Sequence, residues 1–279
     1  MAATIYVTGN FKGGVGKSTT AQMLSYESAL KKNRNTLLID MDPQGNASEV
    51  MELTAENLTG KEVSFKNGDT IWEGMTTYKD LTKVIYPVAE NLDIIPANIK
   101  FSAYPQYIIG KLKNTTEQLK YFAEFIAPLR EMYDVIYIDV PPTISVYSDA
   151  AMYVADWVIL ILQTQVKSLR GGQDYIDYMK FFKKKHNAKL DVLGIVPFMV
   201  QKRDSVDIEV YDMAKELYPD HLISTVVLNN GRLKRYDGDG ITETLTKKGH
   251  VNKKDAHTHK IFLDILEELD ENEEALGEL

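Results

Sequence analysis

Residues 9–20 read Gly9-Asn10-Phe11-Lys12-Gly13-Gly14-Val15-Gly16-Lys17-Ser18-Thr19-Thr20, and this stretch decides the fold. An apolar run, residues 4–8, precedes the glycines, and a stretch with helical spacing, residues 19–32, follows them. In this order of strand, glycine-rich turn and helix, backbone N–H groups at the helix N-terminus surround phosphate groups. The pattern predicts that Lys17 reaches the β- and γ-phosphates of a nucleoside triphosphate and that the Ser18 hydroxyl holds Mg²⁺.

The loop departs from the general phosphate-loop pattern, G-x-x-x-x-G-K-[ST], because Phe11 stands where that pattern has glycine. It carries instead a second lysine at its front, in the order Lys12-Gly13-Gly14-Val15-Gly16-Lys17-Ser18. This order resembles the deviant Walker A signature, K-G-G-x-G-K-[ST], of the ParA/MinD group of P-loop ATPases. The resemblance implies that residues 12–19, Thr19 included, bind ATP. It also implies that Lys12 reaches the nucleotide of a partner subunit, so that ATP binding drives formation of a homodimer.

A second motif, Asp40-Met41-Asp42-Pro43-Gln44-Gly45-Asn46, ends the next apolar run. Its two aspartates point to the same side of an extended segment, and the proline and glycine then force a turn. The motif resembles the D-x-D-P-Q-G-N switch segment of the same family. By that resemblance Asp42 orients or deprotonates the attacking water, and Asp40 supports Mg²⁺ through a water molecule. A turn in which Asp42 only caps the backbone is the alternative.

A third motif, Val135-Ile136-Tyr137-Ile138-Asp139-Val140-Pro141-Pro142, is an apolar strand that ends in one acid. A buried strand that delivers a carboxylate to the water shell of Mg²⁺ is what a Walker B segment requires. The motif resembles the family's D-x-P-P form, which identifies Asp139 as the aspartate on the Mg²⁺ side.

Apolar segments alternate with amphipathic stretches along the chain, which predicts a parallel sheet wrapped by helices. The segments expected to form strands are residues 4–8, 36–40, 92–96, 134–139, 157–162, 190–198 and 224–228. The stretches expected to form helices are residues 19–32, 115–132, 169–186 and 207–217. We therefore expect an α/β fold with a doubly wound, mostly parallel sheet flanked by helices, and, from the resemblance, a P-loop NTPase of the deviant Walker A type.

The length of 279 residues suits one domain with a sizeable core. We expect a single P-loop ATPase domain over residues 1–279, with an insertion near 52–90. The absence of cysteine excludes disulfides, thiolate metal sites and cysteine nucleophiles. No apolar run approaches the length of a membrane span, so we expect a cytoplasmic protein with no membrane partner.

The net charge of −8 comes from residues 264–279, which contain eight acids and no lysine or arginine. We expect this acidic C-terminal tail to be solvated, which leaves a neutral body able to carry a basic face. The tail differs from the basic, membrane-binding helix of MinD-type proteins. The lack of cysteine and of a tyrosine-rich tail excludes two other branches of the group. The partition ATPases remain.

Residues 224–233 resemble the family's T-x-I-P-R-N-x-R-L stretch, with Leu228 and Asn229 in place of its proline and first arginine. Members of this branch bind DNA without sequence preference as ATP-bound dimers, through contacts that depend strongly on salt. The residues expected to contact DNA are Arg203, Arg232, Lys234 and Arg235. We expect the lysines at 183–185 to be a solvated helix end, and the histidines at 250, 257 and 259 to lie in a solvated loop rather than at a metal.

The combined expectation is a weak Mg²⁺-dependent ATPase that forms an ATP-sandwich dimer and drives plasmid or chromosome partition. By resemblance, a centromere-binding, ParB-like protein stimulates hydrolysis, and the ATP-bound form associates with the nucleoid. One alternative is an ATPase of the same fold that positions a protein or membrane cargo. Another is a P-loop metabolic ligase, which the D-x-D-P-Q-G-N segment disfavours.

Overall fold

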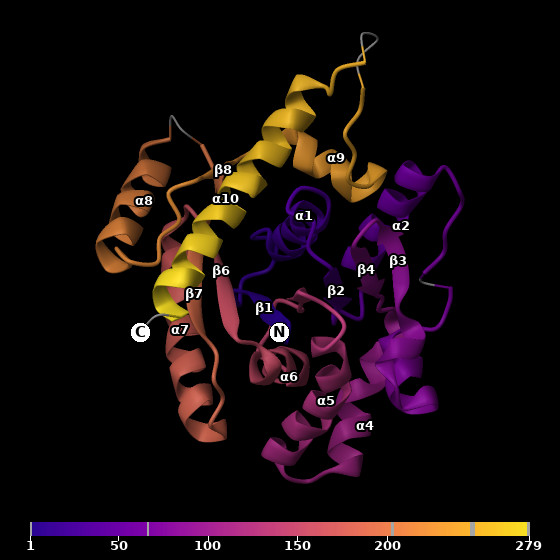
Figure 1. The fold of residues 1–279 in the computed structure, drawn as a ribbon. Coiled ribbons are helices and arrows are strands. Elements are labelled where there is room, and N and C mark those ends of the chain that lie inside the picture. Colours follow the sequence, from indigo (N-terminus) through magenta and orange to yellow (C-terminus); the bar gives the residue numbers. More distant parts are fainter. Residues whose placement is uncertain (1, 66, 202–203, 246–248, 278–279) are drawn as a thin grey trace.

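The computed structural model describes residues 2–65, 67–201, 204–245 and 249–277. An eight-stranded sheet lies at its centre, with the strand order β3-β4-β2-β5-β1-β6-β7-β8 (Figure 1). Neighbouring strands are parallel, apart from the antiparallel pair of β3 and β4 at one edge. The strands are β1 (Thr4–Gly9), β2 (Thr36–Asp40), β3 (Tyr86–Ala89), β4 (Leu92–Ile95), β5 (Val135–Asp139), β6 (Trp157–Gln163), β7 (Asp191–Val200) and β8 (Val227–Leu228). The predicted mostly parallel α/β sheet is confirmed.

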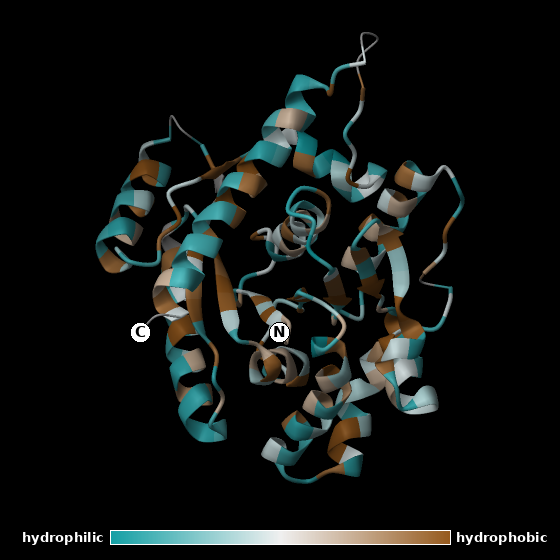
Figure 2. Cartoon of the chain, viewed as in Figure 1, coloured by the Kyte–Doolittle hydropathy of each residue, from teal (hydrophilic) through white to brown (hydrophobic). Residues whose placement is uncertain are grey.

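Helices cover both faces of the sheet and bury an apolar core on each. The helices α1, α2, α9 and α10 pack over the face that carries Leu38 and Tyr137. The helices α5, α6 and α7 pack over the other face, with Ile39 and Ile138, because successive strand residues point to opposite sides. Figure 2 shows the apolar strands at the centre and polar residues along the outer sides of the helices. The helices are α1 (Lys17–Leu30), α2 (Asn46–Thr59), α3 (Ile71–Glu73), α4 (Tyr104–Lys111), α5 (Thr115–Arg130), α6 (Val146–Val154), α7 (Val166–His186), α8 (Ser205–Leu217), α9 (Gly231–Asp239) and α10 (Lys253–Gly277).

Two strands at the β8 edge differ from their predicted lengths. The predicted strand over 190–198 extends to Val200, and the predicted strand over 224–228 pairs only at Val227 and Leu228. An edge strand gains ladder hydrogen bonds from one side only, so apolar residues there need not stay in the sheet. Residues 52–90 add the end of α2, α3, a π-helical turn, a 3₁₀ turn and β3. This segment buries Ile71 and Met75 in the core.

Residues 264–277 of the acidic segment form the second half of α10 and pack on the sheet, in place of the expected solvated tail. Ile265, Leu266 and Leu269 are buried against the sheet face, since the apolar residues recur at helical spacing between the acids. One of the acids, Asp270, accepts two hydrogen bonds from the Arg34 guanidinium at 2.9 and 2.7 Å. No helix within the described residues is both long enough and apolar enough to cross a membrane.

Candidate functional site

The glycine-rich loop joins β1 to α1 at the carboxyl edge of the sheet. Gly14 and Gly16 have φ angles of 70° and 103°, a region that residues with a Cβ rarely adopt. A Cβ at Gly16 would lie 2.3 Å from the ring of Phe198 on β7, so only glycine fits there. Within the described loop no side chain caps α1, and no acid stands in its first turn. The N-terminus of α1 is therefore arranged to receive a phosphate group.

Lys17 begins α1 and lies under the loop, with 6% of its surface exposed. Its ammonium donates across the loop to the backbone carbonyl of Lys12 at 3.2 Å. Burial lowers the pKa of Lys17, and the carboxylates of Asp139 and Asp42 oppose that shift. A partly desolvated cation at the base of the loop can bind an anionic group more strongly than a solvated one can.

Asn10 holds the front of the loop, a role that the sequence motif does not reveal. This residue is 2% exposed, donates to the carbonyl of Ile161 on β6 at 2.7 Å, and accepts from the Lys12 N–H at 2.8 Å. The side chain of Lys12 extends to the end of β6 and the start of α7. The two lysines of the loop thus lie on different sides of it.

Asp40 and Asp139 are paired in register at the ends of β2 and β5, and both are fully buried. Asp40 accepts hydrogen bonds from the Asp42 N–H at 2.9 Å and from the N–H and hydroxyl of Ser48 at 2.9 and 2.7 Å. Asp139 is a described residue whose carboxylate oxygens have no hydrogen-bond partner. Burial raises the pKa of both carboxyl groups, and repulsion by Asp40 raises that of Asp139 further. Both carboxyl groups are therefore harder to ionise than exposed ones, and Asp139 more so than Asp40.

An unsatisfied buried carboxyl group next to a phosphate loop fits the water shell of a divalent cation. Ser18, in the first turn of α1, lies close enough to Asp139 to lower its pKa. Among the described residues no three His, Asp or Glu side chains gather as a metal site. Mg²⁺ commonly binds through one or two protein ligands together with substrate phosphates, so the lack of a larger cluster among the described residues is compatible with a magnesium site. Asp40 is already engaged by Ser48 and lies behind Asp139.

The switch segment turns sharply between β2 and α2. Asp42 accepts a hydrogen bond from the Gln44 N–H at 2.9 Å, and Gly45 has a φ angle of 67°. Asp42 therefore does cap the backbone of this turn. Its side chain also lines the cleft beside the phosphate loop. The position of Asp42 is thus compatible both with capping the turn and with facing a nucleotide in the cleft.

The loop and the switch segment line a cleft of about 610 Å³, a size typical of small-molecule sites. Four lining residues lie outside the three motifs: Gln22 on α1, Glu49 and Val50 on α2, and Asp237 on α9. Burial raises the pKa of Asp237. Among the predicted site residues, those that line the cleft are Gly14, Gly16, Lys17, Ser18, Thr19 and Asp42. Gly13 is exposed at the rim, and Val15 is buried beneath the loop.

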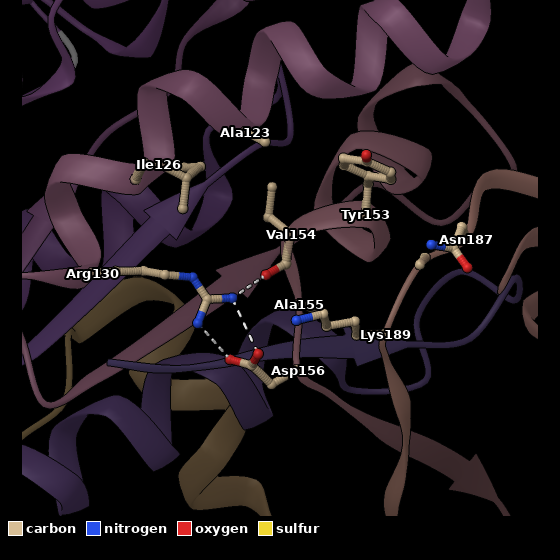
Figure 3. Close-up of a pocket in the computed structure, with 11 residues that line it drawn as sticks. Ala123, Ile126, Arg130, Tyr153, Val154, Ala155, Asp156, Asn187 and Lys189 are labelled. Carbon is tan, nitrogen blue, oxygen red and sulfur yellow. Dashed lines mark hydrogen bonds and ion pairs between the residues drawn. The ribbon is translucent and has the colours of Figure 1, made fainter. Parts of the chain in front are cut away.

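A separate cavity of about 260 Å³ lies at the opposite edge of the sheet (Figure 3). Ala155 and Asp156 line it, and they immediately precede β6. Arg130 lies at its side and binds Asp156 at 2.8 Å and the carbonyl of Val154 at 2.6 Å. These contacts tie α5 to the amino end of the sheet. This cavity is remote from the phosphate loop and is structural in character.

The predicted DNA-contacting residues that the structure describes lie on α9. Lys234 and Arg235 are exposed, whereas Arg232 is 12% exposed and forms an ion pair with the buried Asp255 of α10. A cleft of about 480 Å³ separates the first turns of α9 and α10, and its charged lining is wholly basic: Arg232, Arg235, Lys254 and His257. Arg203 lies outside the described residues.

The other basic and histidine predictions have mixed outcomes. The lysines at 183–185 end α7 at the amino edge of the sheet, and Lys183 binds Asp191 at 2.8 Å. Positive charge there also suits the helix C-terminus. The prediction of a solvated histidine loop is wrong for His257 and His259, which lie on α10. His259 is buried because its Nδ1 pairs with Glu27 of α1.

Comparison with known proteins supports the family and the fold. A family model described as an AAA domain matches residues 3–192. The chromosome partitioning protein ParA of Myxococcus xanthus is 29% identical over 225 residues, which cover 80% of this chain and 75% of that protein. Apo McdA of Cyanothece has a TM-score of 0.75 and 21% identity over 97% of this chain and 99% of its own. A putative plasmid partition protein of Borrelia burgdorferi, bound to AMPPNP, has a TM-score of 0.73 and 23% identity, with 97% and 99% coverage.

Proposed function

This chain belongs to the AAA domain family as a ParA-type ATPase, and on that premise we propose that ATP joins two copies into a DNA-binding dimer. The observation that carries the proposal is the uncapped start of α1 with Lys17 beneath it and the unsatisfied Asp139 beside it. These groups supply what a triphosphate with its metal requires: backbone donors, a cation and a carboxylate.

Each residue of the cleft has a role that follows from its position. Lys17 gives up the carbonyl of Lys12 to bind the β- and γ-phosphates, which are better acceptors because they are charged. Ser18 and Asp139 hold Mg²⁺, which neutralises phosphate charge when bound. Asp40, held by Ser48, keeps a second negative charge behind Asp139 and supports the metal through water.

Asp42 positions the attacking water, because its carboxylate lines the cleft while its backbone is held by Asp40. Hydrolysis is slow in this proposal until a centromere-binding, ParB-like protein stimulates it. In phosphoryl transfer the protein mainly positions groups and stabilises charge, so a modest change at the switch segment is sufficient for control. Hydrolysis then returns the dimer to single subunits.

The helix α9 connects the nucleotide to DNA in this proposal. Asp237 and Thr19 both line the nucleotide cleft, so α9 and α1 each contribute to its wall. Two adjacent residues of the same helix, Lys234 and Arg235, are exposed. The basic cleft between α9 and α10 adds Lys254 and His257. A dimer carries this positive face twice. It should therefore bind the phosphate backbone of DNA more tightly than a single subunit does.

Retention on a nonspecific DNA duplex tests the proposal. The chain is compared without nucleotide, with ADP and with ATP–Mg²⁺, each at two salt concentrations, and its mass is measured in the same states. We expect binding and dimers with ATP only, and binding that falls steeply with salt. Equal DNA affinity without nucleotide, with ADP and with ATP–Mg²⁺ would contradict the proposed switch.

The second candidate is an ATPase that positions a protein or membrane cargo, and the fold likeness to McdA favours keeping it. It predicts ATP-dependent dimers without affinity for the duplex. A metabolic ligase of this fold predicts turnover that requires a small co-substrate. The same nucleotide states, assayed with and without duplex, separate the candidates.

A further inference from the structure

The ammonium of Lys12 is bound by three side chains of its own subunit. It donates to the Gln165 amide oxygen at 2.7 Å, and to Gln163 Oε1 and the Ser168 hydroxyl at 3.1 Å each. An ammonium has three N–H donors, so these three acceptors occupy all of them. Lys12 therefore has to release at least one acceptor before it can bind any other group.

The three acceptors are neutral, and they lie where a cation is poorly placed. Gln165 is the N-cap of α7 and makes no capping hydrogen bond, because its amide oxygen accepts from Lys12 instead. The positive end of the α7 dipole thus lies beside the ammonium, which weakens the contact. A phosphate oxygen is a stronger acceptor than a neutral amide or hydroxyl oxygen. The contact is firm enough to orient Lys12 and weak enough to be exchanged.

We propose that Gln165 and Ser168, with Gln163, are positioning residues that hold Lys12 within its own subunit and set the protein concentration at which ATP forms dimers. The inference rests on the proposed function, in which Lys12 reaches the nucleotide of a partner copy. One ammonium cannot satisfy both sets of acceptors. Each hydrogen bond within the subunit therefore adds to the cost of the contact between subunits.

The hydrogen bonds that restrain the Lys12 ammonium can be tested in the single subunit, without a dimer. Reaction of the chain's lysines with an amine-specific reagent, read by mass spectrometry, reports the exposure of each ammonium in the single subunit. We expect Lys12 to react several-fold faster in Gln165→Ala and in Ser168→Ala than in the unmodified chain, while Lys234 reacts at an unchanged rate. Equal rates at Lys12 would overturn the proposal.

The dimer dissociation constant with ATP–Mg²⁺ is the second measurement. Because this contact is exposed to solvent, its loss should count as an ordinary hydrogen bond and give dimers about three- to ten-fold tighter in Gln165→Ala, with unchanged ATP affinity of the single subunit. Gln165→Glu adds a carboxylate at the ammonium and predicts weaker dimers. Gln106→Glu, exposed on α4, adds the same charge away from Lys12 and serves as the matched control. If the new carboxylate acted only by repelling phosphate groups, Gln165→Glu would weaken the dimers but Gln165→Ala would not tighten them.

The two measurements separate this inference from the proposed function. One outcome is that Lys12 reacts faster in the variants while the unmodified chain never dimerises with ATP. It would support the hydrogen bonds that restrain Lys12 and contradict the proposed dimer. The opposite outcome is that ATP drives dimers but their dissociation constant is the same in Gln165→Ala, Ser168→Ala and the unmodified chain. That outcome would support the proposed dimer and contradict the role of these residues in setting its dissociation constant. Tighter dimers together with faster labelling support both.

Discussion

Arg232 on α9 is bound to Asp255 on α10, with a guanidinium nitrogen 2.9 Å from the carboxylate. Asp255 is completely buried, and its carboxylate also accepts from the Thr244 N–H at 2.9 Å. Burial alone would raise the pKa of Asp255, but the bonds from Thr244 and Arg232 outweigh it and lower the pKa. The arginine that the family resemblance assigns to DNA therefore also holds the basic helix α9 to the rest of the molecule.

Arg232→Ala is expected to destabilise the fold, because it leaves the buried Asp255 without its cation. Removal of one partner of a buried ion pair costs roughly 3–5 kcal/mol, and the partial exposure of Arg232 places the expected loss near the lower value. Urea unfolding at pH 7 measures it. Weaker DNA binding by a variant of unchanged stability would instead identify Arg232 as a direct phosphate contact.

Lys234→Ala combined with Arg235→Ala is expected to weaken DNA binding while leaving stability and ATP-driven dimers intact, since both side chains are exposed. The slope of log Kobs against log salt should become shallower by about 0.9 for each DNA phosphate that the variant no longer neutralises. The matched control is Lys184→Ala with Lys185→Ala, which removes the same charge at the opposite edge of the sheet. An equal effect of the two pairs would show that only net charge matters.

The unfolding free energy should fall as the pH rises above 6.5, because of the pair between His259 and Glu27. Burial lowers the pKa of His259, but the bond from Glu27 outweighs it and raises the pKa above 6.5. Burial likewise raises the pKa of Glu27. The folded chain thus binds protons more tightly than the unfolded chain does. The stabilisation is complete below 6.5 and is lost as the pH passes the folded pKa of His259.

His259→Gln tests this assignment, since glutamine retains a hydrogen-bond donor and does not titrate. Urea unfolding at several pH values should show a smaller decline above pH 6.5 in this variant than in the unmodified chain. At pH 6 the variant should be less stable by about 3 kcal/mol, because the buried carboxyl group of Glu27 loses its charged partner. An identical pH profile would exclude His259 as the titrating group.

Mg²⁺ should bind the nucleotide complex more tightly as the pH rises toward 8. Burial and the neighbouring Asp40 raise the pKa of Asp139 to about 8, so a cation has to displace a proton at lower pH. Titration of Mg²⁺ into the chain with a fluorescent ADP analogue at several pH values measures this. Asp139→Asn cannot titrate and should give weaker binding with little pH dependence. Equal pH dependence in this variant would place the metal elsewhere.

Asp42→Ala is expected to slow ATP hydrolysis by about 10²-fold or more and to trap the ATP-bound dimer, because no group then positions the water. Asp42→Asn keeps an oxygen that can accept from the Gln44 N–H, so it preserves the turn and removes the carboxylate charge. Single-turnover hydrolysis compares the two. Normal turnover in Asp42→Asn, with slow turnover in Asp42→Ala, would reduce Asp42 to a backbone cap.

Local sequence predicted the glycine-rich loop and the two strand-end aspartates, because each of these features lies within a few consecutive residues. The glycines at 14 and 16 are required by their own backbone angles, and Asp40 and Asp139 each end a buried strand. The helices α2, α3, α4, α6, α9 and α10 were not predicted from the sequence. Their apolar residues are interspersed with acids or glycine, and only contact with the sheet shows which face is buried.

The sequence by itself determined the parallel α/β sheet, the glycine-rich loop and the position of both aspartates at strand ends, because apolar strand segments and glycine torsions follow from short-range patterns. Tertiary structure decided the partners of charged groups. Arg232 is 23 residues from Asp255, and Glu27 is 232 residues from His259. No periodicity in a chain encodes such distant pairs. They form because burial makes an unpaired charge costly, and the fold brings the compensating group within reach.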